Sequence, residues 1–182
     1  INTKGTIVRL PPTFITANCM QNERYKKDTL IYLSALQLMS VIIKPVAVAA
    51  ADRIDPQTQK AWRSEFGQPG KVPLALIVNS LIELTELQPL RAILQETNKL
   101  LHWGYYLAFH RQNLAGTTDT LCKYTWQAYL YLEARDIEGF STYLAICFSY
   151  ILETIRDFII QHGLQEAAKL ATPYKIPDLN IK

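Results

Sequence analysis

The amino-acid sequence predicts an all-α fold: a compact helical bundle of about six to seven helices, with an extended N-terminal arm and an extended C-terminal tail. Hydrophobic residues make up 49% of the 182 positions and charged residues 19%, which is the composition of a folded globular chain. Apolar residues recur at helical spacing along most of the sequence. A second strand-like segment is lacking, so we expect helices rather than a sheet.

Prolines near the two ends set the expected boundaries. Pro11 and Pro12 end a possible short strand at Thr6–Leu10, and Pro173 and Pro177 mark an irregular end of the sequence. We therefore expect an extended arm at residues 1–21, a helical bundle at 22–171 and an extended tail at 172–182.

The first expected helix, Glu23–Ile43, is apolar almost all round and should be central and buried. Pro45 should break it, so that Val46–Arg53 forms a separate short helix. The stretch Thr29–Ala51 carries one charge, Lys44, and is long enough to span a bilayer. Polar residues and Pro45 inside this stretch favour a buried core helix, so no membrane partner is expected.

Caps and helix breakers predict the rest of the bundle. Asp55 and Asp136 stand at typical helix starts, because an Asp side chain can accept a hydrogen bond from an unpaired N–H of the first turn. Short connections favour antiparallel neighbours. The expected helices are Pro56–Phe66, Pro73–Leu87, Leu90–Asn113, Asp119–Ala134 and Ile137–Gln161, with Ala115–Thr118 as a connection and a further turn or two at Leu164–Ala171.

The helix expected at Leu90–Asn113 has two different faces. Its apolar side carries Ile93, Leu94, Leu100, Leu101, Leu107 and Ala108, and its other side carries Arg91, Lys99, His102, Tyr106 and His110. We expect the other helices to pack against the apolar side. Part of the basic, aromatic side should then face a partner.

Sequence patterns for catalysis or metal binding are lacking. His102 and His110 lie eight residues apart on one helix, and neither an HExxH nor a CxxC pattern is present. Acid pairs such as Glu83 and Glu86 fit ordinary salt-bridging helix faces. We therefore expect no catalytic residue, no metal and no cofactor, and the chain is predicted not to be an enzyme.

The cysteines and the N-terminal sequence bear on the compartment. Cys19, Cys122 and Cys147 are odd in number and widely spaced, which favours free thiols in a reducing environment. The first residues contain no apolar core of the kind found in secretory leaders. A cytoplasmic location is expected.

Basic side chains are the one positive sign of a binding function. The net charge is +3, and residues 1–100 carry 12 Lys/Arg and 8 Asp/Glu, against 7 and 8 in the remainder. Lysine and arginine attract phosphates by charge, and flat rings offer stacking surfaces for unpaired bases. The predicted contacts to a DNA or RNA backbone are Arg24, Lys26, Lys27, Lys60, Arg63, Arg91, Lys99, His110 and Arg111.

A small, all-helical, mildly basic chain of this kind resembles the small subunit of CRISPR effector (Cascade-like) complexes, or the C-terminal helical domain of their large subunit. The resemblance is architectural, covers most of residues 22–171 and rests on no signature motif. It implies a non-catalytic subunit of a nucleoprotein complex in antiviral defence, with several copies stacked along the complex and touching nucleic acid through basic helix faces.

The alternative is a protein–protein adaptor or structural subunit without nucleic-acid contact. The arm, the tail and the tyrosine-rich segment Tyr124–Tyr131 favour it, because Tyr and Trp are common anchors of protein interfaces. In both readings the partners include other protein subunits, among them copies of the chain itself.

Overall fold

The computed structural model describes residues 23–66, 73–109 and 115–161, which contain six α-helices, one short 3-10 helix and no strand. The all-α prediction is therefore confirmed. The expected arm, the expected tail and the extra turns at Leu164–Ala171 lie outside the described residues. The elements are α2 (Glu23–Ala50), η2 (Ala51–Arg53), α3 (Pro56–Glu65), α4 (Leu74–Glu83), α5 (Gln88–Phe109), α6 (Ala115–Glu133) and α7 (Ile137–Gln161).

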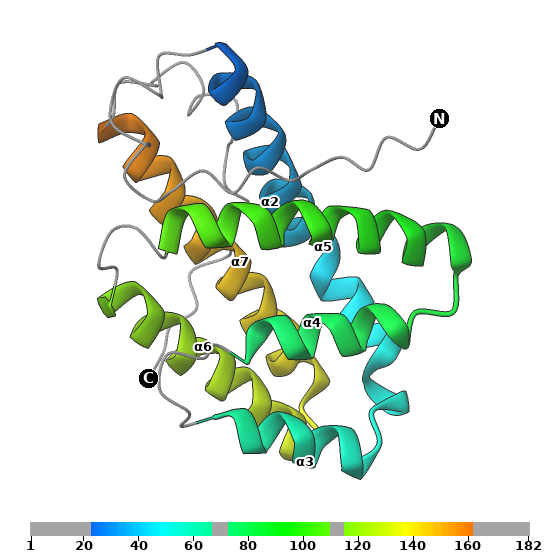
Figure 1. The fold of residues 1–182 in the computed structure, drawn as a ribbon. Helices are drawn as coiled ribbons and strands as arrows, with labels where there is room; N and C mark the ends of the chain where they lie inside the picture. The colour runs from blue at the N-terminus through cyan, green and yellow to red at the C-terminus, as the bar shows by residue number, and fades with distance from the viewer. Residues whose placement is uncertain (1–22, 67–72, 110–114, 162–182) are drawn as a thin grey trace.

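The bundle is built around α7, which packs along both α2 and α6. Helix α5 crosses α2, and α4 and then α3 lie below α5 in the view, so that α4 lies between α3 and α5 (Figure 1). The core is a single cluster of buried side chains drawn from every α-helix. At its α3 edge, Trp62 is fully buried and its Nε1 donates a hydrogen bond to Ser80 Oγ at 3.0 Å.

Helix α2 runs through Pro45 to Ala50, so the prediction of a break and a separate helix Val46–Arg53 was wrong. Proline removes the hydrogen bond to the carbonyl four residues earlier, which belongs to Val41. Pro45 is exposed and the side chain of Val41 is 49% exposed, so this carbonyl lies on the solvent side of the helix. Water can then replace the missing bond, and the helix continues.

The near all-round burial expected for α2 is also wrong. Leu36, Met39 and Ile43 are buried in the core, whereas Leu38 and Val41 lie on a side that is open to solvent. Helix α2 is therefore a core helix on one side only.

Two helix boundaries differ from the prediction by four residues each. Helix α4 ends at Glu83, four residues before the expected Leu87. Helix α6 begins at Ala115, so residues 115–118 belong to the helix and do not form a connection. The glycine and threonines there have weak helix propensity, which costs about 1 kcal/mol for a glycine and is readily overridden by packing.

Two helix starts agree with the prediction. Asp55 Oδ1 accepts a hydrogen bond from the Thr58 backbone N–H at 2.7 Å at the start of α3. Asp136 Oδ1 accepts one from the Gly139 N–H at 2.8 Å at the start of α7, whose bounds are those expected.

Candidate functional site

The structure describes the side chains of four of the nine basic residues that were predicted to touch nucleic acid. Arg24, Lys26 and Lys27 lie on the first turns of α2, where the structure describes the backbone alone, and His110 and Arg111 lie outside the described residues. The side chains of Lys60, Arg63, Arg91 and Lys99 are described.

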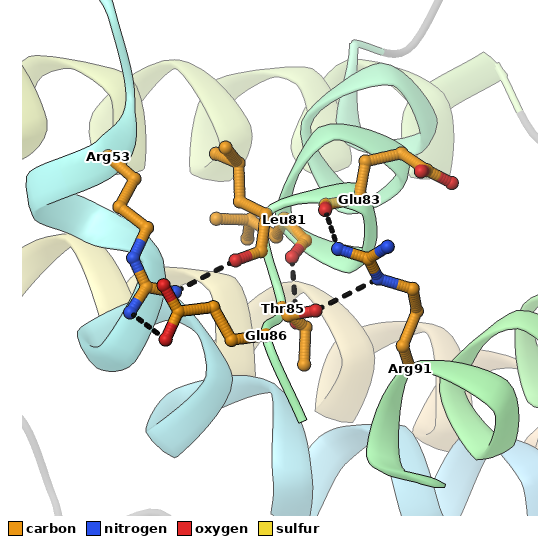
Figure 2. Close-up of polar contacts among 7 residues, drawn as sticks. Arg53, Leu81, Glu83, Thr85, Glu86 and Arg91 are labelled. Carbon is orange, nitrogen blue, oxygen red and sulfur yellow. Dashed lines mark hydrogen bonds and ion pairs between the residues drawn. The ribbon is translucent and has the colours of Figure 1, made fainter. Parts of the chain in front are cut away.

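Arg91 binds the end of the preceding helix. Its Nε donates a hydrogen bond to the Thr85 carbonyl at 2.9 Å, and its Nη2 donates one to the Glu83 carbonyl (Figure 2). The last carbonyls of a helix have no partner within the helix and carry partial negative charge. The half-buried Arg91 therefore supplies both hydrogen bonds and positive charge to the end of α4.

Arg53 approaches the same helix end from η2. Its Nη1 donates a hydrogen bond to the Leu84 carbonyl at 2.9 Å, and its Nη2 lies 3.0 Å from a carboxylate oxygen of Glu86 (Figure 2). The Thr85 hydroxyl donates to the Leu81 carbonyl at 2.9 Å. A helix continued to Leu87 would use the Glu83 carbonyl for the Leu87 N–H, and this carbonyl instead accepts from Arg91. The two arginines also bind the Leu84 and Thr85 carbonyls, just beyond the end of α4.

Arg63 joins α3 to α6. Its Nη1 lies 3.2 Å from Glu133 Oε1, and the Tyr129 hydroxyl donates to the same oxygen at 2.7 Å. Burial, together with the nearby Glu133 carboxylate, raises the pKa of Tyr129 to about 12. The rings of Phe66 and Trp126 pack beside that of Tyr129, with centroids 5.5 and 5.4 Å away. Arg63 thus faces a carboxylate of its own chain.

Lys99 and Lys60 are the more exposed of the four. Lys99 Nζ lies 2.6 Å from Glu96 Oε1 on the same helix, and both side chains are about 70% exposed. Such a surface pair contributes between about 0 and 1 kcal/mol and can exchange readily. Lys60 is exposed on α3, one turn from Arg63. Lys60 lies on α3 and Lys99 on α5, and α4 lies between these two helices (Figure 1).

A row of exposed apolar side chains runs along α2. Ile31 is 43%, Leu38 40%, Val41 49% and Val48 46% exposed. Ser34 and Pro45 are also exposed and fill the gaps in the row. We call these six positions, 31, 34, 38, 41, 45 and 48, the α2 stripe.

The α2 stripe carries no charge. The nearest cation in the helix, Lys44, lies beside the stripe and pairs with Glu138 of α7 at 2.5 Å. The stripe was missed in the sequence because α2 is apolar almost all round, so composition alone did not show which side faces solvent. The positions of the stripe are spaced by three and four residues in alternation, and this spacing was the signal in the sequence that could have shown it.

The same helix is long and apolar enough to cross a membrane over Ile31–Arg53, by length and composition. Half of this window is buried inside the bundle. The core helices of soluble proteins satisfy the same criterion.

The tyrosines of α6 face two directions. Tyr124 and Tyr131 pack against tyrosines of α7, with ring centroids of Tyr124 and Tyr150 5.6 Å apart and those of Tyr131 and Tyr143 5.3 Å apart. Tyr129 packs toward α3, as described above. The aromatic residues that suggested an interface therefore make contacts within the bundle, although these four α6 and α7 rings remain half-exposed.

The described thiols are not activated. Cys147 is fully buried, and burial raises its pKa to about 12, although the Thr125 hydroxyl lies 3.7 Å from its sulfur. Burial also raises the pKa of the half-buried Cys122. Across 23–66, 73–109 and 115–161, no group of three or more His, Cys, Asp or Glu side chains is placed to hold a metal ion.

Comparison with known proteins adds no relative. No protein-family model matches the chain, and neither a curated protein nor a solved structure matches it.

Proposed function

We propose that the chain is a non-catalytic helical adaptor, a structural subunit that binds protein through the α2 stripe. The observation that carries this proposal is the exposure of Ile31, Leu38, Val41 and Val48 in one row on a helix whose other side lies in the core. Scattered apolar side chains on a surface are ordinary, but a contiguous row is typical of an interaction site. Covering these four side chains with a partner would stabilise the complex by roughly 25 cal/mol per Å² of apolar surface removed from water.

The described cations support a protein partner over a polyanion. Arg91 is bound to backbone carbonyls and Arg63 to Glu133. A phosphate would have to displace these partners, and in the case of Arg91 it would also leave the end of α4 unsatisfied.

A nucleic-acid-binding subunit of the CRISPR small-subunit kind is the second candidate. It is favoured by the exposed Lys60 and by the weak surface pair of Lys99, since both ammonium groups are available to a phosphate at little cost. Binding of this kind would fade steeply with added salt, because it depends on the release of counterions.

A capture experiment separates the two candidates. The tagged chain is purified under native conditions at roughly 0.5 M salt, where the Debye length is only a few Å, with and without nuclease. The adaptor function predicts retained protein partners that nuclease does not release and that Val41→Glu abolishes. Leu87→Glu is the matched control, because Leu87 is an exposed apolar residue (68%) outside the stripe.

The opposite pattern would support the second candidate. Partners would then be lost on nuclease treatment or at high salt, and Lys60→Ala with Lys99→Ala would weaken binding whereas Val41→Glu would not. Equal loss with Val41→Glu and Leu87→Glu would argue against the α2 stripe as the docking site.

A further inference from the structure

We infer that the partner of the α2 stripe is a second copy of this chain, bound antiparallel so that two α2 helices pair about a two-fold axis. This inference rests on the proposed function, because it names the occupant of the same surface. The stripe has the alternating spacing of three and four residues that lets two helices pack with side chains as knobs in holes.

The stripe is complementary to itself when it is reversed. With the axis midway between Leu38 and Val41, the opposed positions are 31 with 48, 34 with 45, and 38 with 41. Ile31 then meets Val48 of the other copy, and Leu38 meets Val41. The two smaller residues, Ser34 and Pro45, also fall opposite one another. Every large apolar side chain of the stripe therefore meets another large apolar side chain.

The charges at the ends of α2 favour the antiparallel direction. The helix begins at Glu23, so the sequence places Arg24, Lys26 and Lys27 in its first turns, at the positive end of the helix dipole. A parallel pair would bring these basic ends of both copies together. The antiparallel register instead brings the basic start of each α2 toward the negative dipole end of the other copy's α2, which closes at Ala50.

The middle of the pair is free of like charges. The six stripe positions carry none, and Lys44 beside them is paired with Glu138 of its own chain. Reversal places Lys44 near the Gln37 position of the other copy and away from the second Lys44, so the two ammonium groups do not oppose each other.

A lipid surface is a poorer occupant. Helices that lie on membranes present a broad apolar face beneath a strongly charged one. The stripe takes only two positions of each heptad, and the remaining sides of α2 pack on α7 and α5. A narrow seam of this kind is the geometry of a helix pair.

The size of the surface predicts a reversible dimer. Six positions over about 25 Å of helix, at 1.5 Å per residue, bury less than the roughly 1,200–2,000 Å² of stable complexes. We therefore expect association that depends on concentration, with a Kd in the range of about 1 μM to 1 mM.

Sedimentation velocity over a concentration series tests the proposal. The full chain should move from monomer to dimer, Leu38→Glu and Val41→Glu should weaken the dimer at least about 100-fold, and Leu87→Glu should leave it unchanged. A chain that stays monomeric up to about 1 mM, or a dimer that both stripe variants leave intact, would overturn the proposal. Thermal unfolding of each variant confirms that it is folded.

Cross-linking tests the register. Ile31→Cys and Val48→Cys are made separately in a chain with Cys19→Ser and Cys122→Ser, and the fully buried Cys147 is kept. With a short bismaleimide, an antiparallel pair gives cross-linked dimer only when the two variants are mixed. Cross-linking of either variant with itself would indicate a parallel pair and overturn the proposed register.

The failure of this inference can be told apart from failure of the proposed function. A strictly monomeric chain that still retains other proteins through Val41 would refute the second copy and leave the adaptor function standing. A stripe-dependent dimer that retains no other protein would support the second copy and refute the adaptor function. Stripe-dependent binding to neutral phosphatidylcholine vesicles by a monomeric chain would overturn the inference in favour of a lipid surface.

Discussion

The ring of Tyr131 in α6 packs directly on Gly139 in α7. A Cβ atom at residue 139 would lie 2.4 Å from Tyr131 Cδ1 and 2.6 Å from its Cγ, closer than any real side-chain contact. The atoms concerned belong to the near edge of the ring and cannot move without shifting the whole side chain. The close approach of α6 and α7 at this point therefore requires a glycine.

Replacing Gly139 with alanine should destabilise the protein. Overpacking costs about 1–3 kcal/mol, which outweighs the gain of up to about 1 kcal/mol in helix propensity. The midpoint of urea unfolding should fall accordingly. In a Tyr131→Leu background the ring is gone, so Gly139→Ala should there be neutral or slightly stabilising, and an unchanged cost would refute the ring contact as its cause.

Arg135 adopts φ 58° between α6 and α7, a left-handed conformation that glycine adopts without strain. The Asp136 N–H donates to the Tyr131 carbonyl at 2.8 Å, and the Arg135 N–H donates to the Leu132 carbonyl at 3.0 Å. This is the hydrogen-bond pattern of a helix end closed by a residue in that conformation.

Arg135→Gly should therefore raise the free energy of unfolding by roughly 0.5–1 kcal/mol, because the strain of about 1–2 kcal/mol that it relieves exceeds the entropy cost of a glycine. Arg135→Ala is the control: it also removes the charged side chain but keeps the Cβ, so it should bring no such gain. Equal effects of both substitutions in chemical denaturation would mean that the charge, and not the backbone conformation, decides the outcome.

The starts of α3 and α7 could be predicted from the sequence, because each depends on an aspartate close by in the chain. Asp55 and Asp136 cap α3 and α7 through bonds three residues away, which a single sequence can reveal. The end of α4 depends on Arg53 and Arg91, which come from other elements, and no local pattern around Glu83 could show it. The path of α2 through Pro45 depends on which side faces solvent, which is a property of the whole bundle.

The candidate site was less accessible to sequence reasoning than the fold. A basic residue on a helical wheel looks available for phosphate, yet Arg91 is held by carbonyls of the preceding helix end. The α2 stripe was hidden for the opposite reason. Leu38 is as hydrophobic as its neighbour Leu36, and only the packing of α7 and α5 on one side of α2 separates exposed from buried residues.

Tyr129 should make stability depend on pH in the alkaline range. The folded protein holds its hydroxyl proton to about pH 12, whereas an unfolded tyrosine releases it near ~10. Folded molecules thus bind more protons than unfolded ones between these values. The stabilisation from this group is complete below pH 10 and is lost as the pH rises from about 10 to about 12.

The comparison with Tyr129→Phe isolates this effect from the other groups that titrate there. At neutral pH the variant should lose about 1 kcal/mol, the typical contribution of one hydrogen bond, here the bond to Glu133. The difference in unfolding free energy between the two proteins should shrink as the pH rises from 10 to 12. A difference that stays constant over this interval would show that the proton of Tyr129 is not held by the fold.

Removing the guanidinium of Arg91 should destabilise the protein by roughly 2 kcal/mol, since a charged group hydrogen-bonded to two carbonyls is lost. Arg91→Lys should recover little, because a single ammonium cannot span both acceptors in the way a planar guanidinium does. Lys99→Ala, the matched cation on the same helix, should change stability by less than about 0.5 kcal/mol. Amide exchange near residues 84–88 should accelerate in the Arg91 variants. If Arg91→Ala kept full stability and selectively weakened binding to nucleic acid, Arg91 would be a binding residue and not part of the α4 cap.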